Sequence, residues 1–260
     1  MDWALVAAGL FPAIVLCIYI YRKDRVEKEP LGLLLKLLLS GVVICYPVVV
    51  AEEFLLELFA GNAILENFVG IALAEEGFKL LALFLITKKS REFDSLFDGI
   101  IYATFVSLGF AAFENVLYVI QYGWATALTR AVTSVPAHTF FGVFMGYYYS
   151  LLNIMDKAAI KERKLKEEGL VSKSVPEFSG KKYAVLSLIV PTFAHGLYDY
   201  CCTSDSWLAM LVFFAFLIGM YIYCFGKVKK MSVKDAPVSS YVFSLLAKKY
   251  PELESHIYIM

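Results

Sequence analysis

Two carboxylates and an ammonium group stand together in one apolar segment of the chain. The run Ala74-Glu75-Glu76-Gly77-Phe78-Lys79 holds all three within five residues. At 3.6 residues per helical turn, Glu75 and Lys79 share a helix face and can pair, whereas Glu76 points about 100° away from Glu75. A Glu75–Lys79 salt bridge would therefore account for two of the charges and leave Glu76 unpaired.

Three further apolar segments each hold an acid or an imidazole. One contains Glu114 and Asn115, the next contains His138, and the last contains His195 followed by Asp199. Because His195 and Asp199 are four residues apart, Asp199 can accept a hydrogen bond from one imidazole nitrogen and fix the tautomer of the other. A charged side chain at mid-membrane costs about 2.5–3.5 kcal/mol, so such residues indicate function.

Carboxylates combined with imidazoles suit the activation of water. A glutamate can act as a general base, or glutamate and histidine can hold a divalent metal such as zinc. The sequence has no HExxH motif, and Ser134, four residues before His138, is a weak candidate for a nucleophile. Hydrolysis inside a membrane is therefore the leading reaction class, with metal dependence left open.

The composition supports a membrane location. The chain has 260 residues, with 24 Lys and Arg against 24 Asp and Glu. Apolar residues make up 60 % of it and charged residues 18 %, against about 45–50 % and about 25 % in ordinary soluble domains. These values exclude a disordered chain and a nucleic-acid binder that works by bulk basicity. The five cysteines have no CxxC spacing, so we interpret them as small apolar residues.

Seven segments are long and apolar enough to cross a bilayer. A span needs about 20 mostly apolar residues, and lipid cannot satisfy an open backbone, so each span should be a helix. The sequence therefore predicts an all-α polytopic bundle. The predicted spans are Leu5–Tyr21, Leu31–Ala51, Phe68–Thr87, Phe97–Gln121, Ala131–Ile154, Tyr183–Cys202 and Trp207–Phe225.

The loops between these spans alternate in charge. Those after the first, third and fifth spans and the C-terminal tail are rich in Lys and Arg. The intervening loops carry no basic residue, apart from Arg130 in the fourth. By the positive-inside rule the N-terminus should lie outside and the C-terminus inside. In that topology Glu75, Glu114, His138 and His195 each lie seven residues from the outer end of their span, at one shared depth.

The rest of the organisation is simple. We expect a single integral membrane domain over residues 1–260, with a charged cytoplasmic loop over 156–182 and a cytoplasmic tail over 227–260. The second carboxylate pair, Glu52-Glu53, lacks a nearby lysine and ends the second span. We interpret it as a solvated outer cap or an interfacial turn.

Four motifs in order resemble the PrsW family of intramembrane proteases, which shares a superfamily with the CAAX prenyl proteases and the Aph-1 subunit of γ-secretase. They fall within the core region 68–200. The motifs are Glu75-Glu76-x-x-Lys79, Asp98-Gly99 with Gly109-Phe110 leading into Phe113-Glu114-Asn115, His138, and His195-x-x-x-Asp199.

The resemblance implies an activity and a set of partners. It implies site-1 cleavage of a single-span membrane protein, an anti-sigma factor, near the outer face of a bacterial plasma membrane. That cut would lead to sigma factor activation in a stress response. No nucleic acid is implied as a partner, and a divalent metal such as zinc remains an open cofactor.

Residue roles follow from the same resemblance. It implies Glu75 as the water-activating base with Glu76 beside it, and His138 and His195 as stabilisers of the tetrahedral intermediate. These four are the predicted catalytic residues and the candidate metal ligands. The supporting residues are Lys79, Glu114, Asn115 and Asp199.

Three alternatives remain open at this stage. A non-enzymatic scaffold or receptor in the manner of Aph-1 would keep buried polar residues for helix packing. A CAAX-type protease would act on prenylated proteins. A cation-coupled transporter would also place Glu and His within the membrane, but internal repeats are not found.

Overall fold

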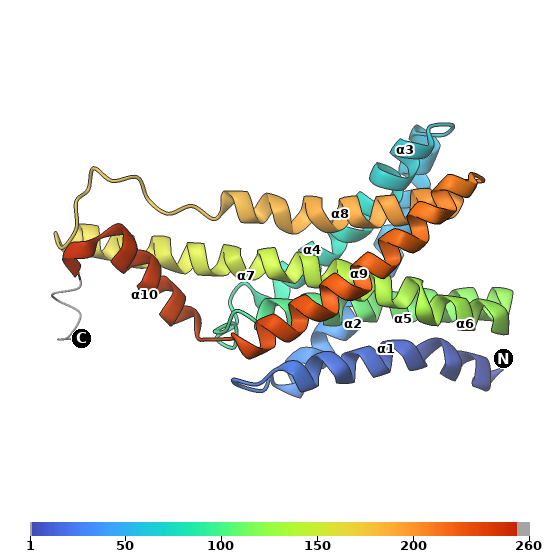
Figure 1. The fold of residues 1–260 in the computed structure, drawn as a ribbon, viewed down its shortest axis with the longest axis horizontal. Helices are drawn as coiled ribbons and strands as arrows, with labels where there is room; N and C mark the ends of the chain where they lie inside the picture. Colours follow the sequence, from blue (N-terminus) through green and yellow to red (C-terminus); the bar gives the residue numbers. More distant parts are fainter. Residues whose placement is uncertain (1, 254–260) are drawn as a thin grey trace.

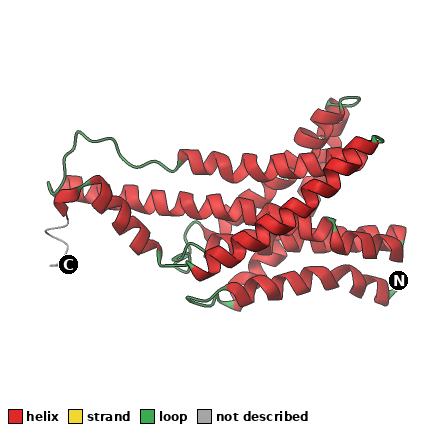
Figure 2. Ribbon diagram, in the orientation of Figure 1, coloured by secondary structure: helices red, strands yellow, loops and turns green. Residues whose placement is uncertain are grey.

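The computed structural model describes residues 2–253 as a bundle of helices (Figures 1 and 2). These residues contain no β-sheet, and only one isolated β-bridge joins Ser95 to Pro237. The all-α prediction is therefore confirmed. The elements are α1 (Trp3–Lys23), α2 (Leu31–Leu58), α3 (Ala63–Leu65), the π-helical segment η1 (Glu66–Leu73), α4 (Ala74–Thr87), α5 (Asp98–Tyr122), α6 (Trp124–Val132), α7 (Ser134–Glu167), α8 (Lys181–Thr203), α9 (Trp207–Val233), α10 (Val238–Lys249) and a 3-10 turn, η2 (Pro251–Leu253).

Each of the seven predicted spans falls on helical structure. Helices α1, α2, α5 and α9 are individually long and apolar enough to cross a membrane. The other three predicted spans, on η1–α4, α7 and α8, carry the polar residues singled out above, apart from Glu114 and Asn115 on α5. The number of spans and the orientation in the bilayer stay predictions.

Two local features depart from seven uniform helices. The third predicted span begins as the π-helix η1 and becomes α-helical at Ala74, directly before Glu75. The short helix α6 precedes α7, and Gly123 separates it from α5 with a φ of 81°, a conformation that glycine adopts at little cost. Departures of the π type are frequent at functional sites.

Helix α5 is the centre of the bundle and is buried along most of its length. It approaches α2 and α7 at glycines. A Cβ atom on Gly109 would lie 1.9 Å from the carbonyl oxygen of Leu38 in α2. A Cβ atom on Gly146 in α7 would lie 2.2 Å from the carbonyl oxygen of Gly99. Such small residues let helix backbones come close together in membranes.

Hydrogen bonds connect the segments near the basic loops at one end of the bundle. The backbone amide of Phe97 donates to Asp235, and Lys157 donates to the carbonyl oxygen of Phe93. Helix α10 lies beside the C-terminal end of α7 (Figure 1) and buries Val242 and Leu246. The last residues of the predicted tail, 254–260, lie outside the described part of the chain.

Candidate functional site

Lys79 joins the two adjacent carboxylates at the start of α4. Its Nζ atom lies 2.8 Å from Glu75 Oε2 and 2.8 Å from Glu76 Oε1. All three side chains are buried. The prediction that Glu76 is unpaired is wrong, because residues three apart on a helix are neighbours as well as residues four apart. One ammonium therefore neutralises part of the charge of both glutamates.

His195 reaches the same cluster from α8. Its Nδ1 atom lies 3.0 Å from Glu76 Oε1, and its Nε2 atom lies 3.2 Å from Asp199 Oδ2. The predicted contact between His195 and Asp199 is therefore present. Both ring nitrogens face carboxylate oxygens, and only a doubly protonated imidazole donates to both. The ring of Phe141 stacks on that of His195, with centroids 4.6 Å apart.

His138 approaches from α7 and has a defined tautomer. Its Nδ1 atom lies 3.2 Å from Lys79 Nζ, and its Nε2 atom lies 3.1 Å from Glu114 Oε2. A lysine ammonium has no acceptor, so His138 Nδ1 must accept and His138 Nε2 must carry the proton donated to Glu114. The lone pair of His138 therefore faces the cluster.

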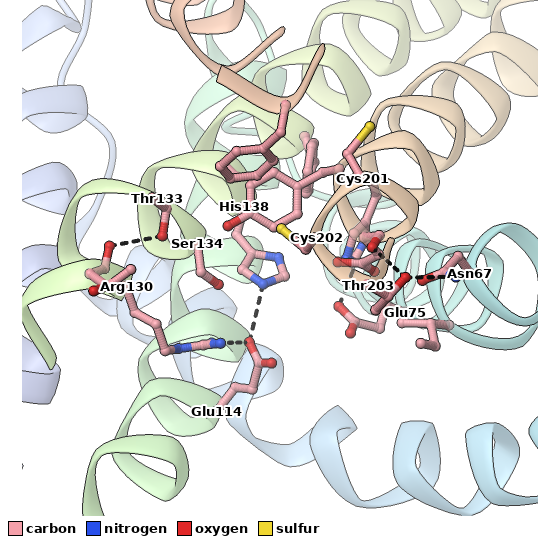
Figure 3. Close-up of a pocket in the computed structure, with 18 of the residues that line it drawn as sticks. Asn67, Glu75, Glu114, Arg130, Thr133, Ser134, His138, Cys201, Cys202 and Thr203 are labelled. Atoms are coloured by element: carbon pink, nitrogen blue, oxygen red, sulfur yellow. Dashed lines mark hydrogen bonds and ion pairs between the residues drawn. The ribbon is translucent and has the colours of Figure 1, made fainter. Parts of the chain in front are cut away.

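Arg130 completes this side of the site, and sequence analysis missed it. Its Nη2 atom lies 2.8 Å from Glu114 Oε2, and its Nε donates to Asn115 Oδ1 at 2.9 Å. Figure 3 shows the side-chain contacts that join His138 to Glu114 and Glu114 to Arg130. Asn115 is not among the residues that line the cavity described below, and its Nδ2 donates to the carbonyl oxygen of Gly9 in α1 at 2.7 Å. One signal could have found Arg130: it is the only Lys or Arg between Arg91 and Lys157.

A cavity of about 960 Å³ gives access to the cluster. Glu75, Glu114, His138, His195 and Asp199 line it, whereas Glu76 and Lys79 are fully buried behind it. Further lining residues come from the α6–α7 junction and the α8–α9 turn, which are predicted outer ends. Of the two adjacent glutamates, Glu75 is therefore the one that meets the cavity.

Comparison with known proteins identifies the family. The family described as "PrsW family intramembrane metalloprotease" matches residues 29–225. The chain belongs to the PrsW family. It is similar to Protease PrsW of Geobacillus kaustophilus, at 34 % identity over 199 residues, which cover 76 % of this chain and 79 % of that protein. It is also similar to Protease PrsW of Bacillus subtilis, at 33 % identity over 219 residues, covering 83 % and 91 %. No solved structure matches the chain.

Membership of the PrsW family decides between the interpretations left open by the sequence. The chain is an intramembrane protease, and its apolar helices and bacterial relatives make it a multi-pass protein of the bacterial membrane. The scaffold, transporter and CAAX-type interpretations are therefore not favoured.

The metal implied by the PrsW family description fits the residues present. Ligand atoms of Glu75, Glu76, His138 and His195 all lie within 4.8 Å of one another, and all four residues are buried. Glu76 Oε2 has no hydrogen-bond partner among residues 2–253. Two imidazoles with carboxylates form the usual donor set of a catalytic zinc site. The cluster could therefore hold a divalent metal.

One residue near this PrsW site differs from its predicted role. Glu52 of α2 lines the cavity, and its buried Oε1 atom has no partner within the described chain. Its neighbour Glu53 is exposed. The pair does not cap a helix end, because α2 continues to Leu58. Adjacent helical residues point about 100° apart, so Glu52 meets the cavity whereas Glu53 is exposed, and an interfacial position for Glu53 stays a prediction.

Proposed function

We propose that this PrsW-family protease cleaves a peptide bond in a single-span membrane protein, close to the predicted outer face. The observation that carries the proposal is the position of Glu75, which lines the cavity and adjoins a buried cluster of Glu76, Lys79, His138 and His195. An anti-sigma factor is the proposed substrate, as the resemblance implies.

Glu75 and Glu76 have separate roles in this proposal. Glu75 meets the cavity, so it accepts the proton of the attacking water. Glu76 is fully buried and holds Lys79 and His195 in place through its Oε1 atom. With a metal bound, Glu76, His138 and, after loss of its Nδ1 proton, His195 would be its ligands, and the metal would polarise the substrate carbonyl and acidify its bound water.

Glu75 and His195 suffice to describe each bond and proton that changes during the hydrolysis. The water oxygen bonds to the carbonyl carbon while its proton passes to Glu75. The negative charge that develops on the carbonyl oxygen is stabilised by the positive charge of the doubly protonated His195, which Glu76 and Asp199 orient. When the C–N bond breaks, Glu75 returns its proton to the leaving amine. The products are one amine and one carboxylic acid, and the acid then loses its remaining proton to water.

Metal content and cleavage should be measured together. Detergent-purified protein is analysed by mass spectrometry, and cleavage of a single-span test substrate is followed before and after chelation. Stoichiometric zinc with chelator-sensitive cleavage supports a metalloprotease that uses His138, His195 and Glu76. Metal-free protein with chelator-resistant cleavage supports a glutamate-based reaction through Glu75.

Substitutions test the roles of the two glutamates. Glu75→Gln and Glu76→Gln should each lower kcat by at least about 100-fold, while the protein keeps its gel-filtration profile. Glu53→Gln is the matched control, because Glu53 is exposed. Wild-type activity in both the Glu75→Gln and Glu76→Gln proteins would contradict the proposal.

A further inference from the structure

The cavity has a second polar wall, formed by α2 and η1, on which two acceptor atoms lack donors. Glu52 Oε1 and Asn67 Oδ1 are both buried and have no hydrogen-bond partner in the described part of the chain. Both residues line the cavity, with Leu56 and Ile71 from the same two elements. Buried polar atoms are nearly always paired, so two orphaned acceptors on one wall require an explanation.

The orientation of Asn67 follows from its other contacts. Its side chain is only 4 % exposed. Its Nδ2 donates to the carbonyl oxygen of Ala63 at 2.8 Å and to Thr203 Oγ1 at 3.3 Å, and Figure 3 shows Asn67 beside Thr203. The donor half of the amide is therefore used, and the acceptor half remains available.

The charge of the cavity favours a positive occupant for this wall. Four acidic residues line the cavity: Glu52, Glu75, Glu114 and Asp199. Among the described residues that line it, Arg130 is the only Lys or Arg, and Glu114 already pairs with it. Glu52 itself is repelled by Glu75 and Glu114, and it is attracted by the buried His195 and Lys79. A cation beside Glu52 would relieve this repulsion.

The sequence around this wall is also negatively charged. Glu53 and Glu57 are exposed on the last turns of α2. The connection from Glu57 to Asn67 contains no Lys or Arg. A positively charged segment of a bound polypeptide would therefore meet no Lys or Arg on this connection that could repel it as it approached Glu52.

We propose that Glu52 and Asn67 form a subsite for a Lys or Arg side chain of the substrate, next to the scissile bond. This inference rests on the proposed protease function. Lys and Arg carry donors and no acceptor, which matches a wall of two acceptors. Basic residues are uncommon at the outer ends of spans, so this subsite would select a small class of single-span proteins.

A substrate series tests the subsite directly. One single-span test substrate is prepared with Lys, Gln or Glu at each of the three positions on either side of its cleavage site. We expect wild-type protein to favour Lys over Gln at one of these positions by about tenfold or more in kcat/KM, chiefly through KM. Glu52→Gln should bring this ratio to about one, and Glu52→Lys should invert the preference toward Glu.

Two controls separate recognition from other roles. Glu53→Gln should keep the wild-type preference, because Glu53 is exposed one residue away on the same helix. The zinc content of Glu52→Gln should equal that of wild type. A wild-type protein without preference for Lys at any position, or a Glu52→Gln protein that loses activity equally on all substrates, would overturn the subsite.

A binding measurement distinguishes failure of the subsite from failure of the protease assignment. The Glu75→Gln protein is titrated with fluorescent Lys and Gln substrates, so that no cleavage is needed. Tighter binding of the Lys substrate that disappears in Glu52→Gln/Glu75→Gln supports the subsite even if wild-type protein cleaves nothing. Equal binding of both substrates contradicts it even if cleavage is efficient.

Discussion

The ammonium of Lys79 lies 3.2 Å from Nδ1 of His138, the ring nitrogen that does not contact Glu114. The same ammonium contacts Glu75 and Glu76, and the face of Phe110 lies 4.2 Å from it. Lys79 therefore supplies a positive charge at the centre of the four residues that could hold a metal. A divalent metal bound to His138 Nδ1 would have to displace this contact.

Lys79→Met should destabilise the protein and make its stability depend on divalent metal. Removal of one partner from a buried ion pair costs about 3–5 kcal/mol, because charge is left uncompensated. Zinc should offset part of that cost, since it binds the folded state. Thermal unfolding in detergent should show a lower Tm for Lys79→Met and a larger rise on zinc addition than for wild type. The exposed-lysine variant Lys89→Met is the control. An unchanged Tm for Lys79→Met would contradict this role.

Much of the fold could be predicted from the sequence because the bilayer constrains it strongly. Apolar length and the need for internal hydrogen bonds define helical spans without knowledge of their neighbours. The i,i+4 spacing predicted the contact of His195 with Asp199. A shared predicted depth in the membrane groups Glu75, His138 and His195, and the structure brings their ligand atoms within 4.8 Å of one another.

The details that failed depend on helix rotation and on partners far apart in sequence. The π-helix η1 precedes α4 and sets the direction in which Glu75 points. No simple pattern of apolar residues in the sequence marks this π-helix. Glu52 and Glu53 have the same chemistry, so only the packing of α2 shows which one meets the cavity. Arg130 acts through Glu114, sixteen residues away on another helix, which spacing rules for one helix cannot reveal.

Arg130 and Glu114 should act as a single positioning unit for His138. Arg130→Gln and Glu114→Gln should each lower kcat about 10- to 100-fold, because both loosen the orientation and tautomer of the imidazole. The double variant should be little worse than either single one, since residues in one network are not additive. Arg130→Lys should restore activity only in part, because an ammonium cannot bond Glu114 and Asn115 in the planar geometry of a guanidinium. Additive losses in kcat would contradict the shared role.

Glycines at the helix crossings should be sensitive to a single methyl group. Gly109→Ala would place Cβ 1.9 Å from a backbone oxygen of α2, so the helices must separate. Overpacking of this kind costs about 1–3 kcal/mol. Gly77→Ala is the matched control within α4, because its Cβ would meet nothing within 4 Å, and alanine should stabilise the helix by about 0.5–1 kcal/mol. Tm measured in detergent should fall for Gly109→Ala and hold or rise for Gly77→Ala. The reverse order would refute the packing argument.

The contact between α10 and α7 should weaken in acid through Glu162. Its carboxylate accepts hydrogen bonds from Lys249 at 2.6 Å, from Tyr250 at 2.5 Å and from the amide of Phe178 at 2.8 Å. Burial alone would raise the pKa of Glu162, but these bonds outweigh it and hold the pKa below its ordinary value. A lowered folded-state pKa stabilises the contact above about pH 4.3, and this stabilisation is lost as the pH falls through the folded-state pKa.

Hydrogen exchange of residues 238–250 between pH 3 and pH 7 measures this effect, after correction for the intrinsic exchange rate. Wild-type protein should lose protection only in the most acidic part of the range. Glu162→Gln should lose about 1–3 kcal/mol of protection at pH 7, because Lys249 loses a charged partner. The same variant should show a flatter pH dependence. Glu167→Gln, an exposed glutamate on the same helix, should behave as wild type. Full protection of α10 in Glu162→Gln would show that its apolar contacts suffice.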